Sequence, residues 1–143
     1  MEALRKSLES LGFRNVKTIL ASGNVVFESP ETNGEKITKK IEERLERDFG
    51  FFISVIVRLF GELEEMNGFF GQERPGERQF VTFLAEKPKV KAADPRIVKV
   101  FGSNLFAVLG PDQKTVDYMA FLDRQFGKNT TRNWNTIEKI LKA

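Results

Sequence analysis

The sequence contains no cysteine and no histidine. Without cysteine the chain cannot form disulfides, thiolate nucleophiles, zinc ribbons or iron–sulfur clusters. Without histidine it lacks the commonest general base, so a Ser-His-Asp triad, a metalloprotease helix and a zinc deaminase site are all excluded. Any catalysis would depend on carboxylates, lysines, arginines, hydroxyl groups or the single tyrosine, Tyr118. These absences favour a protein that is not an enzyme, and nothing in the sequence indicates a metal or another cofactor.

The sequence also lacks a long apolar run and a strong excess of one charge. No apolar stretch approaches the roughly 20 residues that cross a bilayer, and the first residues lack the charged-then-apolar order of a secretion signal. We therefore expect a cytoplasmic protein with no membrane partner. Lysine and arginine number 23 against 20 acidic residues, a net charge of +3. This excess is small for a nucleic-acid-binding protein, because such proteins concentrate positive charge on one face.

The length of 143 residues predicts one domain, residues 1–143, with subdivisions at 1–60 and 61–143. In the first subdivision, hydrophobic periodicity predicts a helix that ends near Gly12 and a β-hairpin over residues 16–27. A helix over 35–49 and a β-branched, buried strand over 52–58 follow. The order helix–strand–strand–helix–strand is that of a ferredoxin-like β-α-β-β-α-β unit without its first strand.

The missing first strand has a structural consequence, because in that fold it lies in the middle of the sheet, between the third and fourth strands. One alternative is that the strands at 25–28 and 52–58 pair directly as a parallel crossover unit. The other is that the open edge recruits a strand from a second chain, because unpaired backbone groups template further pairing. The second alternative predicts a homo-oligomer through an exposed sheet edge.

The second subdivision repeats the alternation of helix and strand more weakly. The pattern predicts a short helix near Leu63, a strand at 80–84, a helix from Asp94 to Phe101 and a strand at 105–109. Two helices then end the chain, the first with Val116, Met119, Leu122 and Phe126 inward and the second with Trp134, Ile137, Ile140 and Leu141 inward. The predicted fold class is therefore α+β, with a ferredoxin-like first half that lacks its first strand, a second smaller αβαβ half and C-terminal helices.

Two polar motifs are candidate anion-binding sites. Ser22 and Asn24 flank a glycine, and short glycine-containing turns bind anions through backbone amides; the alternative is a hairpin turn with glycine chosen for its positive φ, which we favour. Thr131, Arg132 and Asn133 precede the last helix, and helix N-termini attract phosphates. The alternative there is that Thr131 or Asn133 caps the helix while the next residue, a tryptophan, packs inward.

The strand at 80–84 also matches the last part of the RNA-recognition-motif signature, in which aromatic residues stack on bases. Phe80 and Phe83 fall on opposite faces of a strand, so they cannot form one stacking platform. The basic-Gly-aromatic-Gly order expected before them is absent as well. We therefore interpret both residues as part of the core.

The sequence resembles the bacterial domain-of-unknown-function family 1697 along most of its length. The motifs that carry the resemblance are Leu11-Gly12-Phe13 with Val16, Ser22-Gly23-Asn24-Val25-Val26-Phe27, Phe80-Val81-Thr82-Phe83-Leu84 and Thr130-Thr131-Arg132-Asn133-Trp134-Asn135-Thr136. The resemblance implies a ferredoxin-like first half and no known activity. It also implies a preceding strand that carries Leu-Arg-Gly-Ile-Asn-Val-Gly, and the printed sequence begins after it. A site that uses the Arg and Asn of that strand is therefore not expected in this chain.

Three classes of function follow from these observations. The first, which we favour, is a non-catalytic binding or protein-interaction domain with an unknown partner. The second is nucleic-acid or nucleotide binding through Arg132, Lys128 and the basic C-terminal helix, which predicts salt-dependent affinity. The third is an enzyme of unknown class without Cys, His or metal. The fold alone does not distinguish these classes.

Overall fold

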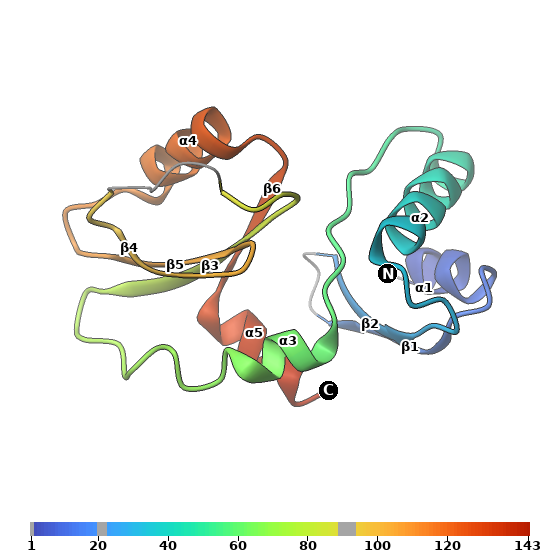
Figure 1. Cartoon of the computed structure of the whole chain (residues 1–143), viewed down its shortest axis with the longest axis horizontal. Coiled ribbons are helices and arrows are strands. Elements are labelled where there is room, and N and C mark those ends of the chain that lie inside the picture. The colour runs from blue at the N-terminus through green and yellow to red at the C-terminus, as the bar shows by residue number, and fades with distance from the viewer. Residues whose placement is uncertain (1, 20–22, 89–93) are drawn as a thin grey trace. The chain divides into compact units, whose positions relative to one another are not determined.

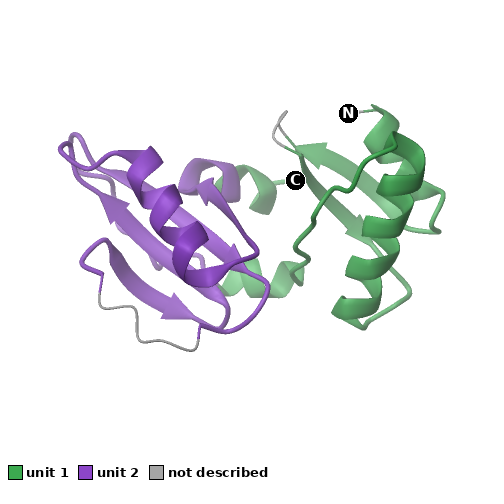
Figure 2. Ribbon diagram, turned by 90° about the horizontal axis from the view of Figure 1, so that it is seen from above, with its two compact units in different colours: residues 1–65, 138–143 green, residues 66–137 purple. Residues whose placement is uncertain are grey.

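The computed structural model describes residues 2–19, 23–88 and 94–143. The chain forms two compact units, one of residues 1–65 with 138–143 and the other of residues 66–137 (Figure 2). Both units combine helices with an antiparallel sheet, which confirms the predicted α+β class. No helix in these described ranges is long and apolar enough to cross a membrane.

The first unit is built on a two-stranded sheet. In chain order it contains α1 (Glu2–Glu9), β1 (Arg14–Ile19), β2 (Asn24–Glu28), α2 (Gly34–Phe49) and α3 (Phe60–Glu65). The helices α1 and α2 lie on the same side of the antiparallel β1–β2 hairpin (Figure 1). Their apolar faces and the hairpin enclose a core of Leu8, Phe13, Val16, Ile37, Ile41 and Leu45. The predicted hairpin and both of its helices are confirmed.

The helix α2 has clear start and stop signals. The side chain of Asn33 accepts a hydrogen bond from the backbone N–H of Lys36 at 3.1 Å, which satisfies a donor that the helix itself leaves unpaired. At the other end Gly50 adopts φ 82° and its N–H donates to the carbonyl of Glu46. Glycine adopts this left-handed conformation without a steric penalty, so the helix ends there.

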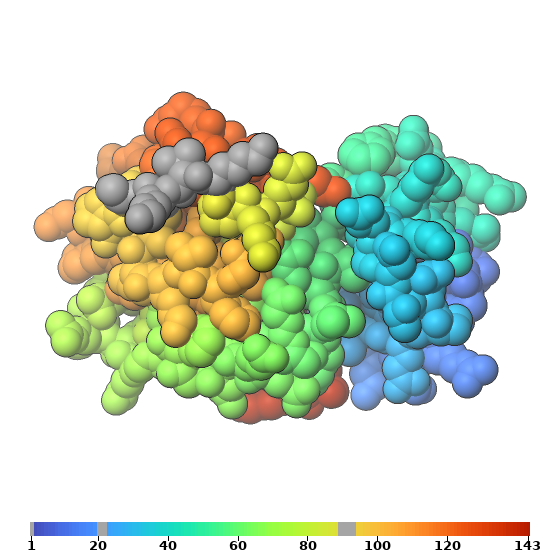
Figure 3. Space-filling model, viewed as in Figure 1, coloured from blue at the N-terminus to red at the C-terminus, as the bar shows by residue number. Residues whose placement is uncertain are grey.

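The residues at 52–58 do not form the predicted strand. They connect α2 to α3 without joining a sheet, and among the described residues the first unit's sheet contains only β1 and β2. Direct pairing of 25–28 with 52–58 is therefore also wrong. Yet Ile53, Val55 and Val57 pack on the same core as the hairpin, with the alternation expected of a strand. The segment has the side-chain pattern of a strand but no neighbouring strand to pair with, and part of the connection is visible at the surface (Figure 3).

The second unit is built on a four-stranded sheet covered by a helix. It contains β3 (Arg78–Leu84), β4 (Ile97–Phe101), β5 (Asn104–Leu109), α4 (Thr115–Phe126), β6 (Asn129–Asn133) and the first half of α5 (Trp134–Leu141). The strand order is β4-β5-β3-β6, and every neighbouring pair is antiparallel. The helix α4 lies on one face of the sheet (Figure 1) and packs on Leu84, Leu105, Ala107 and Leu109. The opposite face carries Phe106, whose ring meets Phe69 and Phe70 edge-to-face.

The predicted αβαβ order of this half is wrong in two places. Residues 97–101 form β4 instead of a helix, because the Asp94 carboxylate accepts from the backbone and side chain of Arg96 and holds a turn there. The β-branched residues that follow pair with β5 across a tight turn at Gly102, which adopts φ 60°. The strand β6 was not predicted at all. In α4, Val116 is 70% exposed instead of inward, and Tyr118 is buried in its place.

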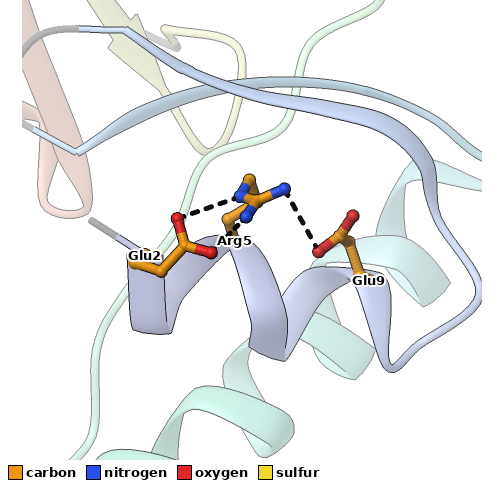
Figure 4. Close-up of polar contacts among 3 residues, drawn as sticks. All are labelled: Glu2, Arg5 and Glu9. Atoms are coloured by element: carbon orange, nitrogen blue, oxygen red, sulfur yellow. Dashed lines mark hydrogen bonds and ion pairs between the residues drawn. The ribbon is translucent and has the colours of Figure 1, made fainter.

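Exposed ion pairs line the outer face of α1. Arg5 lies between Glu2 and Glu9, with its Nη1 3.7 Å from Glu9 Oε1 (Figure 4). The hydrogen bond from Arg5 lowers the pKa of Glu2 below its usual value. Such exposed pairs at helical spacing contribute little to stability, because water already solvates both charges. We therefore interpret this face of α1 as a solvated surface and not as a binding site.

The two units have related topologies. In the second unit, β3 lies between β5 and β6, as the first strand of a ferredoxin-like sheet lies between the third and fourth. The hairpin β4–β5 and the helix α4 then correspond to the hairpin β1–β2 and the helix α2 of the first unit. By the same correspondence, β6 matches residues 52–58. The described residues of the first unit contain no counterpart of β3.

Candidate functional site

The predicted site at the β1–β2 turn is described only in part. Ser22 lies outside the described residues. Gly23 has φ 82°, the left-handed conformation that hairpin turns require. The side chain of Asn24 is buried, and its Nδ2 donates to the carbonyl of Ile19 at 3.2 Å, across the base of the turn. The described contacts of Asn24 therefore serve the hairpin.

The side chains of the predicted C-terminal site residues point in different directions. They lie at the end of β6, where Thr131 is paired with Thr82 and the two hydroxyl oxygens are 2.7 Å apart. Successive side chains of a strand point to opposite faces, so Thr131 faces α4 and Arg132 faces away from it. Arg132 Nη1 donates to the hydroxyl of Thr130 at 2.6 Å and to the carbonyl of Thr131 at 3.0 Å. Burial lowers the pKa of Arg132.

Asn133 forms the N-terminal cap of α5. Its Oδ1 accepts from the backbone N–H of Thr136 at 2.9 Å and from the Thr136 hydroxyl at 3.0 Å. Trp134 follows and is buried, with 8% of its surface exposed. The predicted alternative, a cap followed by an inward tryptophan, matches these contacts. Thr131, Arg132 and Asn133 therefore do not converge on one point.

Replacement of Asn133 separates the capping role from anion binding. We expect Asn133→Ala to lower the free energy of unfolding by about 1 kcal/mol, because the N–H of Thr136 loses its acceptor. Asn133→Ser keeps a capping oxygen and is expected to retain most of the stability. Urea unfolding followed by Trp134 fluorescence measures both variants. Equal stability of Asn133→Ala and the wild type would contradict the capping role.

Tyr118, which has no predicted role, is the most unusual polar residue of the second unit. Its side chain is fully buried, and within the described ranges its Oη makes no hydrogen bond. The guanidinium of Arg96 lies over the ring, 4.9 Å from its centroid. Burial raises the pKa of Tyr118 to about 12, because the phenolate would be poorly solvated. The Thr82 hydroxyl lowers the pKa of Tyr118 and so offsets part of this rise. That hydroxyl is itself hydrogen-bonded to Thr131.

The raised pKa of Tyr118 predicts a loss of stability at high pH. Below the unfolded value near 10 the phenol is protonated in both states; as pH rises toward about 12, only the unfolded state loses the proton. Unfolding should therefore become easier by on the order of 2 kcal/mol over this window. Tyr118→Phe should remove this loss of stability at high pH and leave the stability at neutral pH unchanged or slightly higher. Because Tyr118 is the single tyrosine, tyrosinate absorbance measures its pKa directly; a midpoint near 10 in the folded protein would contradict the prediction.

The extended segment at residues 52–58 contains backbone groups that make no hydrogen bond within the described ranges, and it lies beside exposed apolar side chains. The N–H of Val55 donates to Glu42 Oε2 of α2 at 3.0 Å. In an extended segment successive N–H groups point to opposite edges, so those of Ser54 and Ile56 point away from that carboxylate. Within the described part of the chain, neither the backbone of Ser54 nor that of Ile56 makes a hydrogen bond. We call this side of residues 52–58 the acceptor edge.

Large apolar side chains are exposed at both ends of the acceptor edge. Phe51 and Phe52 are 62% and 60% exposed at the start of the segment, and Leu59 is 74% exposed just after it. No charged residue occurs at 52–57 or in β2 before Glu28. Phe51 and Phe52 are adjacent in the chain, and neighbouring exposed apolar side chains are characteristic of interaction surfaces. The described residues also bring together no three acidic side chains that could hold a metal ion.

The comparisons with known proteins place the chain in a family. A family model described as Protein of unknown function (DUF1697) matches residues 1–110. The chain belongs to this DUF1697 family. The match includes the first unit through α3 and extends to the end of β5, so the motif at 130–136 lies outside it. No curated protein and no solved structure matches the chain. The description of the DUF1697 family names no activity.

Proposed function

We propose that this member of the DUF1697 family is a non-catalytic protein-interaction domain whose first unit binds an extended segment of a partner as an added strand. The observation that carries the proposal is the acceptor edge. Residues 52–58 pack on the core like a strand, yet the backbone groups of Ser54 and Ile56 make no hydrogen bond within the described chain. Unpaired backbone groups of this kind template pairing with another chain.

The outer strand of the second unit's sheet has features that the acceptor edge lacks, and this difference supports the proposal. The outer strand β4 has the irregular register of a bulge between Ile97 and Lys99, and it carries a lysine at its centre. Bulges and lysines on edge strands prevent pairing with other chains. The acceptor edge has neither feature. Of these two edges, only that of the first unit has the character of a binding site.

Hydrogen exchange with added peptide tests the proposal. The probes are a seven-residue peptide with the sequence of residues 78–84, charged variants of it and a scrambled version. If the proposal holds, at least one ordered peptide slows amide exchange in residues 52–58 and in β2, and the scrambled peptide does not. If no peptide slows exchange there, and concentrating the protein alone does not either, the proposal is wrong.

A proline variant localises the binding. Ser54 is exposed, and Ser54→Pro removes one of the donors of the acceptor edge without removing a packed side chain. We expect Ser54→Pro to lose the peptide-dependent protection and Ser54→Ala to keep it. Loss in both variants would indicate that the hydroxyl is recognised and not the backbone.

Phosphate or nucleic-acid binding through Arg132 is the alternative that the sequence raised. The contacts of Thr131, Arg132 and Asn133 do not favour it, because their side chains serve the sheet and the helix cap. The alternative predicts retention on heparin at low salt that Arg132→Met abolishes. Such retention would make anion binding a separate function of the second unit.

A further inference from the structure

We infer that Asn67 is a site of spontaneous covalent modification, at which the side-chain amide is lost and an aspartate or isoaspartate is formed. The chain contains the dipeptide Asn-Gly twice, as Asn33-Gly34 and as Asn67-Gly68. In this dipeptide the glycine nitrogen can attack the side-chain amide of the asparagine, because glycine has no side chain that hinders a close approach of its backbone. The local structure leaves this reaction open at Asn67 and opposes it at Asn33.

The reaction consumes water and releases ammonia. The Gly68 nitrogen gives up its proton and forms a bond to Cγ of Asn67, while the bond between Cγ and the side-chain nitrogen breaks and ammonia leaves. Water then attacks either carbonyl carbon of the resulting cyclic imide, and the ring C–N bond at that carbon breaks. Attack at Cγ gives an aspartate in a normal backbone. Attack at the backbone carbonyl gives isoaspartate, in which the main chain runs through the former side chain.

The reacting groups of Asn67 and Gly68 are accessible and unengaged. Asn67 is exposed in a turn just after α3, which the N–H of Phe69 closes by donating to the carbonyl of Met66 at 3.0 Å. Within the described ranges, neither the Asn67 side chain nor the Gly68 N–H makes a hydrogen bond. Gly68 has φ +91°, and a Cβ atom there would meet nothing within 4 Å, so no other residue packs against that side of the turn.

The matching dipeptide at the start of α2 is held in an unreactive conformation. Asn33 Oδ1 accepts from the backbone N–H of Lys36 at 3.1 Å, and the backbone of Asn33 is extended, with ψ 111°. The cyclic imide requires the next nitrogen to eclipse Cβ, whereas at this ψ the Gly34 nitrogen points away from Cβ. A Cβ atom at Gly34 would also meet nothing within 4 Å, so the helix cap and not crowding distinguishes the two sites. Reaction at Asn33 therefore needs the first turn of α2 to open.

Modification of Asn67 adds a negative charge beside a helix end that is already negative. The helix α3 carries Glu62, Glu64 and Glu65 and has no basic residue in its last turn. A carboxylate just beyond the C-terminus of a helix is unfavourable, because the last carbonyl groups carry partial negative charge. Isoaspartate also lengthens the backbone of the turn by one carbon atom.

The turn at Asn67 positions two aromatic side chains of the second unit. The ring of Phe69 meets those of Phe101 and Phe106 edge-to-face, and the ring of Phe70 meets those of Phe106 and Trp134. A lengthened turn cannot keep both rings in these places while its ends stay fixed. We therefore expect isoaspartate at position 67 to loosen the packing of residues 66–70 on the sheet of the second unit.

Peptide mapping of the aged full chain tests the site. The protein is kept at mildly alkaline pH, where the glycine N–H loses its proton more readily, and mass spectrometry follows the conversion of amide to acid at both dipeptides. We expect conversion at Asn67 to be about fivefold faster than at Asn33 or more, because the cap must open first. In concentrated urea the two rates should become similar. No conversion at Asn67, equal rates in the folded protein, or the same ratio of rates in urea as in buffer would overturn the inference.

Hydrogen exchange of the aged protein tests the consequence of the modification. Asn67→Gln is the matched control, because its longer side chain would have to close a larger ring. Asn33→Ser removes the other Asn-Gly dipeptide and keeps a capping oxygen. After ageing we expect faster amide exchange at Phe69 and Phe70 in the wild type and in Asn33→Ser, but not in Asn67→Gln. Unchanged exchange in wild-type protein whose Asn67 has been converted would overturn the inferred loosening.

Discussion

Gly76→Ala is expected to lower the free energy of unfolding by about 2–4 kcal/mol, from a left-handed backbone and an overlap with Pro111 together. Gly76 adopts φ +81°, and a Cβ atom there would lie 2.9 Å from Pro111 Cγ. Real Cβ atoms do not approach another carbon so closely, and the proline ring has little freedom to move. The loop before β3 would have to separate from the loop after β5. Urea unfolding followed by Trp134 fluorescence measures the change.

Gly68→Ala is the matched control for this prediction. Gly68 has φ +91°, close to that of Gly76, but a Cβ atom there would meet nothing within 4 Å. We therefore expect Gly68→Ala to lower the free energy of unfolding only through its left-handed backbone, by about 1–2 kcal/mol. A second test combines Gly76→Ala with Pro111→Ala, which should recover part of the loss because the overlapping ring atom is gone. Equal destabilisation by Gly68→Ala and Gly76→Ala would show that the Pro111 contact is unimportant.

The fold of the first unit could be predicted from local patterns, because each of its elements has a strong signal of its own. The apolar spacing of Ile37, Ile41 and Leu45 indicates α2, and these residues are buried in its core. The exception is residues 52–58. Their β-branched composition favours extended backbone and the structure keeps the alternation, but strand formation also needs a neighbouring strand. Pairing is a property of the whole sheet, which a local pattern cannot report.

The second unit was harder to predict, because the strand signal of β4 competes with a helix signal and β6 is a polar strand. Asp94 and the proline after it resemble a helix start, but the same carboxylate caps a turn that leads into β4. The strand β6 is polar and only five residues long. It is recognisable afterwards from the two adjacent β-branched residues, Thr130 and Thr131, which pair with β3.

The candidate sites show a similar division between local and non-local information. The capping role of Asn133 depends on residues within one helical turn, and the sequence raised it as an alternative. The burial of Tyr118 under Arg96, and the lack of a hydrogen bond at the Ser54 backbone among the described residues, depend on residues far apart in the chain. No sequence motif indicates the burial of Tyr118 or the state of the Ser54 backbone. A buried polar residue or an open strand edge becomes visible only when the neighbours in space are known.

Leu45→Ala is expected to destabilise the unit that carries the acceptor edge by about 2–5 kcal/mol, because the substitution leaves a cavity under α2. Leu45 is 2% exposed and belongs to the core on which residues 52–58 pack. Leu59→Ala is the control: this leucine is 74% exposed, so its removal should change stability by less than about 0.5 kcal/mol. Hydrogen exchange resolves the effect by segment, and we expect faster exchange in α1, α2 and the β1–β2 hairpin for Leu45→Ala. Because a ligand of the native state opposes unfolding, the peptide of residues 78–84 should restore part of that protection. Unchanged exchange in Leu45→Ala would mean that this core does not support the hairpin, and the acceptor edge would then lack the rigid framework that strand binding requires.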